Sequence, residues 1–425
     1  MPVKTFVTLL EPGLKKVRKS GRIKVMERNG TEKPYLFGLS RNVFFTGLVS
    51  LFMDISSEMV YPLVPLFLTN VIGATKTAVG IIEGIAEATA SLLKVFSGWL
   101  ADRFGRKKLL MTLGYATSAA SRPVIAVSGT WFQVLTARFI DRFVKGIRTA
   151  PRDAIIADST DSSRLGLAFG FHRSMDTIGA VLGPGIAFVI LYLFMGNLRL
   201  VFFASTIPAV IAVFLIIIFI KERKRTRAEE EAASRLPRLS ISSFNGQFRR
   251  YLVVIGVFSL GNFADAFFIL QAENLGIKSE LIPIVYLAYN IVYAASSVPM
   301  GMLADRIGLK NMILAGFLVY SAIYSLVGLS SQAIHIWILF PIYGVYKGMS
   351  EGNLRAYLAK LAPSRHKATA FGVYHTIVGL MLLPASIIAG WLWDNLGAGT
   401  TFFYGAVMSA LAAALFAVLR VGKDE

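Results

Sequence analysis

The sequence predicts an all-α integral membrane protein with twelve transmembrane helices, arranged as two similar bundles of six. The first supporting observation is composition: 55% of the 425 residues are hydrophobic and 16% are charged, whereas soluble domains carry about 25% charged residues. The second is a series of apolar stretches long enough to cross a bilayer. The third is a short motif that occurs at the same place in each half of the chain, which indicates an internal repeat.

Each predicted helix corresponds to one apolar stretch of about 20 residues. Six of them lie near 42–68, 77–101, 108–128, 131–157, 166–193 and 199–220, and six near 249–272, 280–304, 310–330, 335–361, 367–392 and 400–420. The sixth is the clearest, because the charge-free stretch Leu200–Ile220 ends at a charged run that begins with Lys221. We therefore predict a basic tail over 1–41, bundles over 42–220 and 249–425, and a linker over 221–248.

The net charge of +19 predicts topology rather than nucleic-acid binding. Lys and Arg gather in the N-terminal tail and in the loops after the even-numbered stretches, for example 103–108 and 221–227. Such loops lie on the cytoplasmic side of membrane proteins. The pattern predicts a multi-pass protein of the cell membrane, embedded in lipid, with both termini in the cytoplasm and no nucleic-acid partner.

Several chemistries are disfavoured by the residues present. The chain has no cysteine, which excludes disulfides and thiolate metal ligands. Its four histidines are scattered, and neither a phosphate-binding Gly-x-x-x-x-Gly-Lys motif nor a His-Glu-x-x-His motif occurs. We expect no cofactor, no metal site and no enzymatic activity.

The repeat is carried by two pairs of segments. Gly98-Trp99-Leu100-Ala101-Asp102-Arg103-Phe104-Gly105-Arg106-Lys107 recurs as Gly301-Met302-Leu303-Ala304-Asp305-Arg306-Ile307-Gly308-Leu309-Lys310. Ala168-Phe169-Gly170 recurs as Ala370-Phe371-Gly372 at nearly the same offset of about 200 residues. The halves are therefore parallel duplicates.

The first of these segments resembles the signature loop of the major facilitator superfamily, and the resemblance covers the chain from about residue 40. It implies two six-helix bundles around a central cavity, inverted three-helix repeats in each bundle, and a functional monomer. It also implies a conformational latch formed by the loop and an acidic residue ending the fourth helix. The residues that match are Gly98, Asp102, Arg103, Gly105, Arg106, Asp158, Asp305 and Arg306. The alternative is that these charges only anchor the topology, and Lys360 in place of a second Asp158 shows that a second latch would differ.

Two further segments resemble motifs of the same family. Gly179-Ala180-Val181-Leu182-Gly183-Pro184 is similar to the Gly-x-x-x-Gly-Pro motif of proton-linked antiporters, which implies efflux. The alternative is a proline kink with small residues for helix packing. Arg142-x-x-Lys145-Gly146 resembles a motif whose arginine is linked with proton transfer, although Lys145 stands where Gln is common.

Ionisable residues inside predicted helices are costly and indicate function. Seven acidic residues nearly balance eight basic ones in the first half, which predicts paired charges in a polar interior. The candidates for the cavity or for proton coupling are Asp54, Glu58, Glu83, Glu87, Arg142, Lys145, Arg173, Asp176, Asp265, Asn290, Tyr286, Lys347 and Glu351. Asp54 and Glu58 are preferred for coupling, because residues four apart share a helix face and can share one proton; Arg142 could discharge it. The alternative is that both are locked in static pairs with arginines of the fourth helix.

These observations predict a secondary active transporter that works by alternating access. Proton-coupled export of a small polar or charged solute is the preferred hypothesis. A uniporter or importer of a polar metabolite or metal chelate on the same fold remains open, and so does a membrane sensor that transports nothing.

Overall fold

The computed structural model describes residues 35–36, 38–104, 106–161, 164–222, 246–362 and 367–419, with side chains described except over 94–104 and 367–368. Every long element in these ranges is a helix. Most of the predicted tail over 1–41 and of the predicted linker over 221–248 lies outside the described residues.

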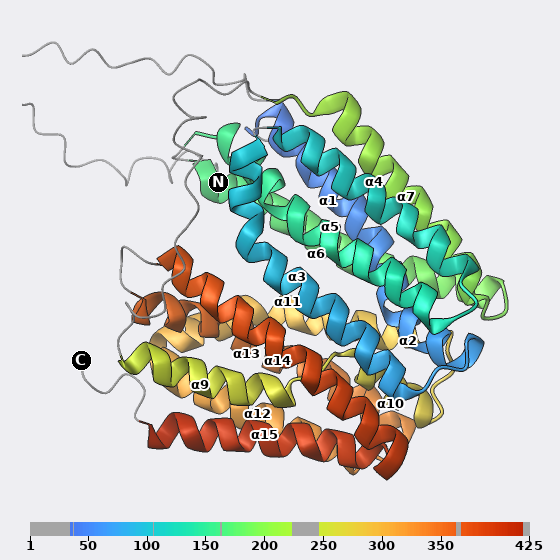
Figure 1. Cartoon of the computed structure of the whole chain (residues 1–425), viewed down its shortest axis with the longest axis vertical. Coiled ribbons are helices and arrows are strands. Elements are labelled where there is room, and N and C mark those ends of the chain that lie inside the picture. The colour runs from blue at the N-terminus through green and yellow to red at the C-terminus, as the bar shows by residue number, and fades with distance from the viewer. Residues whose placement is uncertain are drawn as a thin grey trace, which may run out of the picture.

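The helices form two bundles, one above the other in Figure 1. The first bundle contains α1 (Arg41–Val60), the short turns η2 (Tyr61–Leu63), α2 (Val64–Leu66) and η3 (Phe67–Val71), and then α3 (Lys76–Phe104), α4 (Lys107–Val127), α5 (Trp131–Asp158), α6 (Leu165–Leu193) and α7 (Leu198–Phe219). The second contains α9 (Gly246–Gly261), α10 (Ala266–Asn274), α11 (Ile282–Ile307), α12 (Leu309–Gly328), α13 (Ala333–Leu361), α14 (Lys367–Leu396) and α15 (Ala398–Val418).

The predicted helices are confirmed. Counting 41–71 and 246–274 as one span each, the described chain contains twelve long helical spans, and each overlaps one predicted stretch. Eight of them are long and apolar enough to cross a membrane by length and composition alone. The other four, α3, α4, α5 and α13, contain the buried ion pairs described below, which lower their hydropathy.

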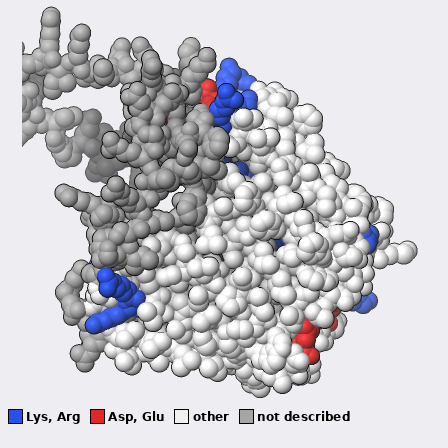
Figure 2. Space-filling view, in the orientation of Figure 1, with Lys and Arg blue, Asp and Glu red and all other residues white. Residues whose placement is uncertain are grey.

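The surface is consistent with a lipid environment. In Figure 2 the visible face is almost free of charge between two ends at which Lys, Arg, Asp and Glu gather. At one end of the molecule α1 and α9 begin and α7 ends. We call it the basic end, because it carries Arg41, Lys107, Lys108, Lys221 and Arg250. The opposite end is called the far end.

Two spans are interrupted by irregular turns. The first changes from α-helix to 3₁₀ and π turns over 61–71, where Pro62 and Pro65 occur. The seventh breaks between α9 and α10, over residues 262–265. Irregular backbone at membrane depth is tolerated only inside protein or beside a cavity. Both breaks lie between the two bundles, because η2 packs against α11 and α2 against α10.

Side chains from neighbouring helices satisfy the backbone freed by the second break. The Tyr320 hydroxyl donates to the Gly261 carbonyl at 2.8 Å, and the Tyr404 hydroxyl donates to the Leu260 carbonyl at 2.7 Å. The Ala264 amide donates to the Ser386 hydroxyl at 3.2 Å. These bonds hold the broken segment in one conformation, so the side chains that follow it are placed reproducibly.

The bundles meet mainly where α3 packs against α14. Glycines allow close approach: a Cβ on Gly379 would lie 2.9 Å from the Ser91 Cβ, and one on Gly390 would lie 2.6 Å from the Thr77 Cα. At the far end, the Asp394 carboxylate of α14 accepts hydrogen bonds from the Lys76 and Thr77 amides at 3.0 and 2.8 Å. The second bundle thus caps the first turn of a helix in the first bundle, whose amides have no intrahelical partner.

Candidate functional site

A cavity of about 360 Å³ lies between the bundles near both helix breaks. Its wall is rich in charged side chains from both bundles. It is lined by Ser57, Glu58, Tyr61, Glu87, Ser91, Arg122, Arg138, Asp141, Arg142, Lys145, Asn262, Phe263, Ala264, Asp265, Tyr286, Lys347, Glu351, Val378 and Leu382. A space of this size accommodates a small solute.

The wall from α3 and α5 is a ladder of two ion pairs. Glu83 and Glu87 lie four residues apart on α3, and Arg138 and Arg142 lie four apart on α5, so the partners face each other. Arg138 Nη2 donates to both Glu83 oxygens at 2.7 and 2.6 Å, and Arg142 Nη2 lies 3.2 Å from Glu87 Oε1. The Glu83 and Arg138 side chains are 1% and 2% exposed, which makes that pair a fixed part of the scaffold.

A third pair connects α4 to α5. Arg122 lies 3.7 Å from Asp141, and it also donates to the hydroxyls of Ser56 and Ser57 on α1. Charged groups removed from water need such partners, because an unpaired buried charge is strongly destabilising. The predicted pairing of the intramembrane charges is confirmed for these residues.

The second bundle contributes one pair at the end of its broken helix. Asp265, at the start of α10, accepts a hydrogen bond from the Tyr343 hydroxyl at 2.8 Å and lies 3.3 Å from Lys347 Nζ. On the same side of the cavity Glu351 accepts from the Tyr293 hydroxyl and from Arg355 at 3.0 and 3.1 Å. Both halves therefore present paired charges to the cavity.

Asp54 and Glu58 differ from these residues. Among the described side chains, no Lys, Arg or His nitrogen lies within 4.0 Å of either carboxylate, and one oxygen of Glu58 is buried without a hydrogen-bond partner. Their nearest electrostatic neighbours include Lys145, which likewise makes no ion pair within the described part of the chain. The Tyr286 hydroxyl of the second bundle interacts with Glu58. Static pairing with arginines of α5, the alternative raised from the sequence, is not seen here.

The two glycines of the antiporter-like motif pack against these carboxylate residues. A Cβ on Gly179 would lie 2.8 Å from the Asp54 Cβ, and one on Gly183 would lie 2.7 Å from the Glu58 Cβ. Nothing lies within 4 Å of a Cβ on Gly185, the next glycine. The Gly-x-x-x-Gly spacing therefore lets α6 approach α1 where the unpaired carboxylates occur.

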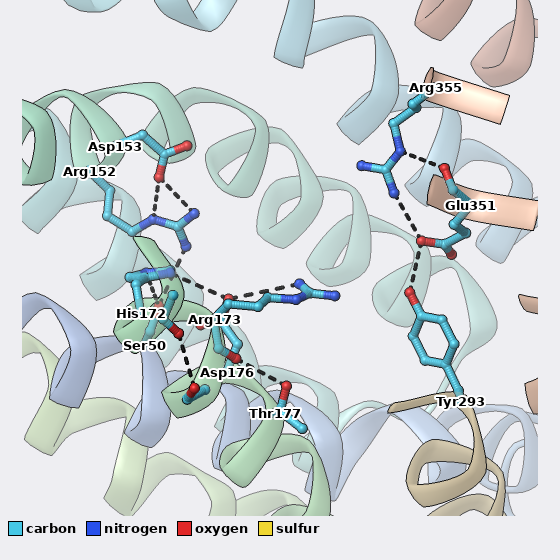
Figure 3. A network of polar contacts seen from close by, with 12 residues as sticks. Ser50, Arg152, Asp153, His172, Arg173, Asp176, Thr177, Tyr293, Glu351 and Arg355 are labelled. Carbon is cyan, nitrogen blue, oxygen red and sulfur yellow. Dashed lines mark hydrogen bonds and ion pairs between the residues drawn. The ribbon is translucent and has the colours of Figure 1, made fainter. Parts of the chain in front are cut away.

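A second polar network lies between the cavity and the basic end (Figure 3). In the first bundle it joins Ser50, Arg152, Asp153, His172 and Asp176, and Arg173 approaches Asp176 at 4.0 Å. Across from it, Figure 3 shows Tyr293, Glu351 and Arg355 of the second bundle. The side chains of Arg173 and Arg355 are 71% and 50% exposed. Charged groups that face each other yet stay exposed indicate that the space between the bundles opens toward the basic end.

The predicted latch is described only in part. Gly105 and the side chains of Asp102 and Arg103 lie outside the described part of the chain, and so does the burial of Gly98; Arg106, Asp305 and Arg306 are exposed. Asp158 forms an ion pair with Lys107 of the signature loop at 2.6 Å. Glu222, just after α7, accepts hydrogen bonds from the amides of Lys107 and Lys108 at the start of α4.

The structure separates the predicted cavity and coupling residues into four groups. Eight line the cavity, namely Glu58, Glu87, Arg142, Lys145, Asp265, Tyr286, Lys347 and Glu351. Glu83 stands behind Arg138, and Asp54, Arg173 and Asp176 lie toward the basic end. Asn290 donates to the Ala180 carbonyl at 3.4 Å, a contact between the bundles. Pro184 is inside α6.

Sequence reasoning missed several wall residues. Tyr61 lies 5.9 Å from the guanidinium groups of Arg138 and Arg142, a cation–π distance, and its position before two prolines could have indicated a helix break. Phe263 and Ala264 line the cavity only because the helix breaks there. The preceding Gly261-Asn262 is a turn-like dipeptide. No group of three or more metal-ligating residues occurs in the described part of the chain.

Comparison with known proteins agrees with this architecture. The sequence model described as Major Facilitator Superfamily matches residues 46–272 and 252–425. An uncharacterized MFS-type transporter of Methanocaldococcus jannaschii is 33% identical over 406 residues, covering 94% of this chain and 99% of that protein. The multi-drug resistance efflux pump PmrA of Streptococcus pneumoniae is 24% identical, covering 72% and 78%. The crystal structure of the nucleoside transporter NupG superposes with a TM-score of 0.73 at 12% identity, covering 90% and 100%.

Proposed function

The chain belongs to the major facilitator superfamily and is a membrane transporter, and from that premise we propose that it exchanges protons for a small polar or charged solute in the direction of export. Proteins of this family are transporters and not enzymes, and the same holds for this chain. The cell membrane is its location in this proposal, and the monomer is its working unit. The predicted bundles, 42–220 and 249–425, rock about the central cavity.

One observation carries the proton coupling. Asp54 and Glu58 are the carboxylates near the cavity that lack an ion pair within the described residues, while Glu83, Glu87 and Asp141 each have an arginine partner. A carboxylate held by an arginine stays charged, because the pair would lose its attraction on protonation. A carboxylate without such a partner can take up and release a proton during a transport cycle.

The group formed by Asp54, Glu58 and Lys145 gives the exchange a physical basis. Lys145 is the basic neighbour that acts on both carboxylates. When the carboxylates are charged they can bind a cationic group of a solute in place of Lys145, and when they are protonated that attraction is lost. Proton and solute then compete for the same carboxylates, and this negative coupling between two ligands is what exchange requires.

The basic end faces the cytoplasm in this proposal, following the positive-inside rule. The hydrogen bonds of Asp394 close the far end, so the conformation described here is open inward. The proposed latch at the basic end is formed by the signature loop, Lys107 and Asp158.

Two observations support export. Gly179 and Gly183 of the antiporter-like motif pack directly against Asp54 and Glu58. The streptococcal relative is named an efflux pump. Both point to an antiporter that releases solute on the far side as protons move inward.

Proton flux in liposomes tests the proposal. The protein is reconstituted with a trapped pH-sensitive dye, a pH gradient is imposed, and pools of amino acids, organic acids, nucleosides, sugars and cationic drugs are added in turn. We expect one pool to dissipate the gradient with the intact protein and not with Asp54→Asn, while Asp161→Asn, at an exposed acidic residue, retains the flux. Solute movement without any change in pH would overturn proton coupling and leave a uniporter, or an importer driven by another ion.

A further inference from the structure

We propose that Ser50, His172 and Asp176 form a proton relay that connects Asp54 with the water at the basic end of the cavity. The proposal rests on the proton coupling proposed above and identifies the route by which that proton moves between Asp54 and the basic end. The three residues line the space between α1 and α6 on the same side as Asp54, which is one helical turn beyond Ser50 on α1.

The contacts form a continuous chain. The Ser50 hydroxyl lies 2.8 Å from His172 Nε2, and His172 Nδ1 lies 3.5 Å from Asp176 Oδ2. The other Asp176 oxygen is buried without a hydrogen-bond partner. Asp176 interacts electrostatically with Asp54, and Gly179, one turn along α6 from Asp176, packs on Asp54. An unsatisfied buried carboxylate oxygen next to a second carboxylate is a site that can accept a proton.

The hydrogen bonds also define the resting form of the imidazole. Arg152 donates to the Ser50 hydroxyl oxygen at 3.5 Å, so the hydroxyl proton is directed to His172 Nε2. Nε2 is then the acceptor and Nδ1 carries the proton that faces Asp176. The charged groups around His172 are Arg152 and Asp153 from α5 and Arg173 and Asp176 from α6 (Figure 3).

Transfer of a proton along this chain is balanced. In uptake from the basic end, His172 Nδ1 gives its proton to Asp176 as Nε2 takes one from the Ser50 hydroxyl, and Asp176 passes a proton to Asp54, directly or through a water molecule. Ser50 regains a proton from water on the side of Arg152 and Asp153, whose side chains are 19% and 42% exposed. The ring is left protonated on Nε2, from which release runs the same steps in reverse, and exchange with water restores the Nδ1 form.

The cavity residues do not offer an equivalent route. Glu83, Glu87 and Asp141 are held by arginines, and an arginine does not give up its proton in proteins. His172 is the one histidine of the described chain that stands next to a buried carboxylate and within the network of Figure 3. It is therefore the group that can take a proton at one ring nitrogen while it gives one from the other.

Time-resolved infrared spectroscopy tests the relay without a known solute. The full chain is reconstituted in vesicles of phosphatidylethanolamine and phosphatidylglycerol, the pH is lowered by a light-triggered acid, and the carboxylic acid C=O band lost in Asp54→Asn is followed. We expect His172→Gln to slow the rise of this band about 100-fold without changing its final height, and Asp176→Asn to slow the rise as well. Ser174→Ala, whose hydroxyl binds only the Gly170 carbonyl of its own helix, is the matched control.

Chemical rescue separates a relay from a structural role. Imidazole added to His172→Ala restores the rate if the ring carries protons, whereas a merely structural defect is not repaired. An unchanged rate in His172→Gln would overturn the relay and leave proton coupling by Asp54 intact. The complete absence of an Asp54 band in the unmodified protein overturns the proton coupling itself, and the relay with it.

Discussion

Gly183 of α6 packs against Glu58 of α1 so closely that a Cβ on the glycine would lie 2.7 Å from the Glu58 Cβ. Real Cβ atoms do not approach at this distance, so a side chain at residue 183 must push the two helices apart. The contact places a small-residue helix face directly against a carboxylate residue that has no ion pair within the described part of the chain.

Gly183→Ala is therefore expected to lower the free energy of unfolding by about 1–3 kcal/mol, the usual cost of overpacking, and to reduce proton-coupled flux. Gly185→Ala, two residues further along the same helix with nothing within 4 Å of its Cβ, should change neither quantity. Thermal unfolding in detergent, followed by tryptophan fluorescence, gives the first quantity and the liposome assay the second. Equal effects of the two substitutions would contradict the proposed packing.

Arg138→Ala should be the most destabilising of these substitutions. It leaves the Glu83 carboxylate buried and unpaired, which costs about 3–5 kcal/mol. The double variant Arg138→Met with Glu83→Leu removes both charges at similar volume and should recover most of that stability. Chemical unfolding in detergent compares the three proteins; a double variant as unstable as the single one would show that the pair is not a simple scaffold contact.

Asp394→Ala should favour the conformation that opens at the far end. The carboxylate caps the first turn of α3 from the other bundle, and loss of a cap costs about 1 kcal/mol, which is about a fivefold change in population. Because the chain has no cysteine, spin labels on cysteines introduced at the exposed Val71 and Leu396 report the far-end distance without background. Asn395→Ala is the control, because the Asn395 amide donates to the Trp391 carbonyl within its own helix. An unchanged distance between the spin labels in Asp394→Ala would show that Asp394 does not hold the far end closed.

Glu222→Ala should loosen the start of α4. The side chain accepts from the amides of Lys107 and Lys108, and α4 has no side-chain cap from the residue that precedes it. We expect a loss of about 1 kcal/mol, with Glu222→Gln losing less because an amide oxygen still accepts. Hydrogen exchange of the 107–111 amides measures the effect, and unchanged protection in Glu222→Ala would rule out this cap.

The helices could be predicted from the sequence because the bilayer demands long apolar stretches, and each predicted stretch overlaps a helical span. The helix breaks at 61–71 and 262–265 could not be predicted in this way, because the mean hydropathy of a stretch of about 20 residues is insensitive to a few irregular residues. The spacing of four residues places Glu83 and Glu87 on one face of a helix, and it does the same for Arg138 and Arg142. It does not predict the ion pairs between them, because these depend on how α3 and α5 pack. Asp54 and Glu58 were preferred for their spacing alone; the absence of an ion pair in the described residues is a property of three-dimensional neighbours.

The pairing of charges in the cavity wall determines how the transporter responds to voltage. Each arginine of the α3–α5 ladder moves together with its carboxylate when the bundles rock, so these pairs carry no net charge across the electric field. Moving a single uncompensated charge across the membrane would change its electrostatic free energy by about 2.3 kcal/mol for each 100 mV of membrane potential. The movement of the ladder itself should thus be nearly indifferent to membrane potential. The voltage sensitivity of transport would come from the Asp54, Glu58 and Lys145 group and from the solute that it binds.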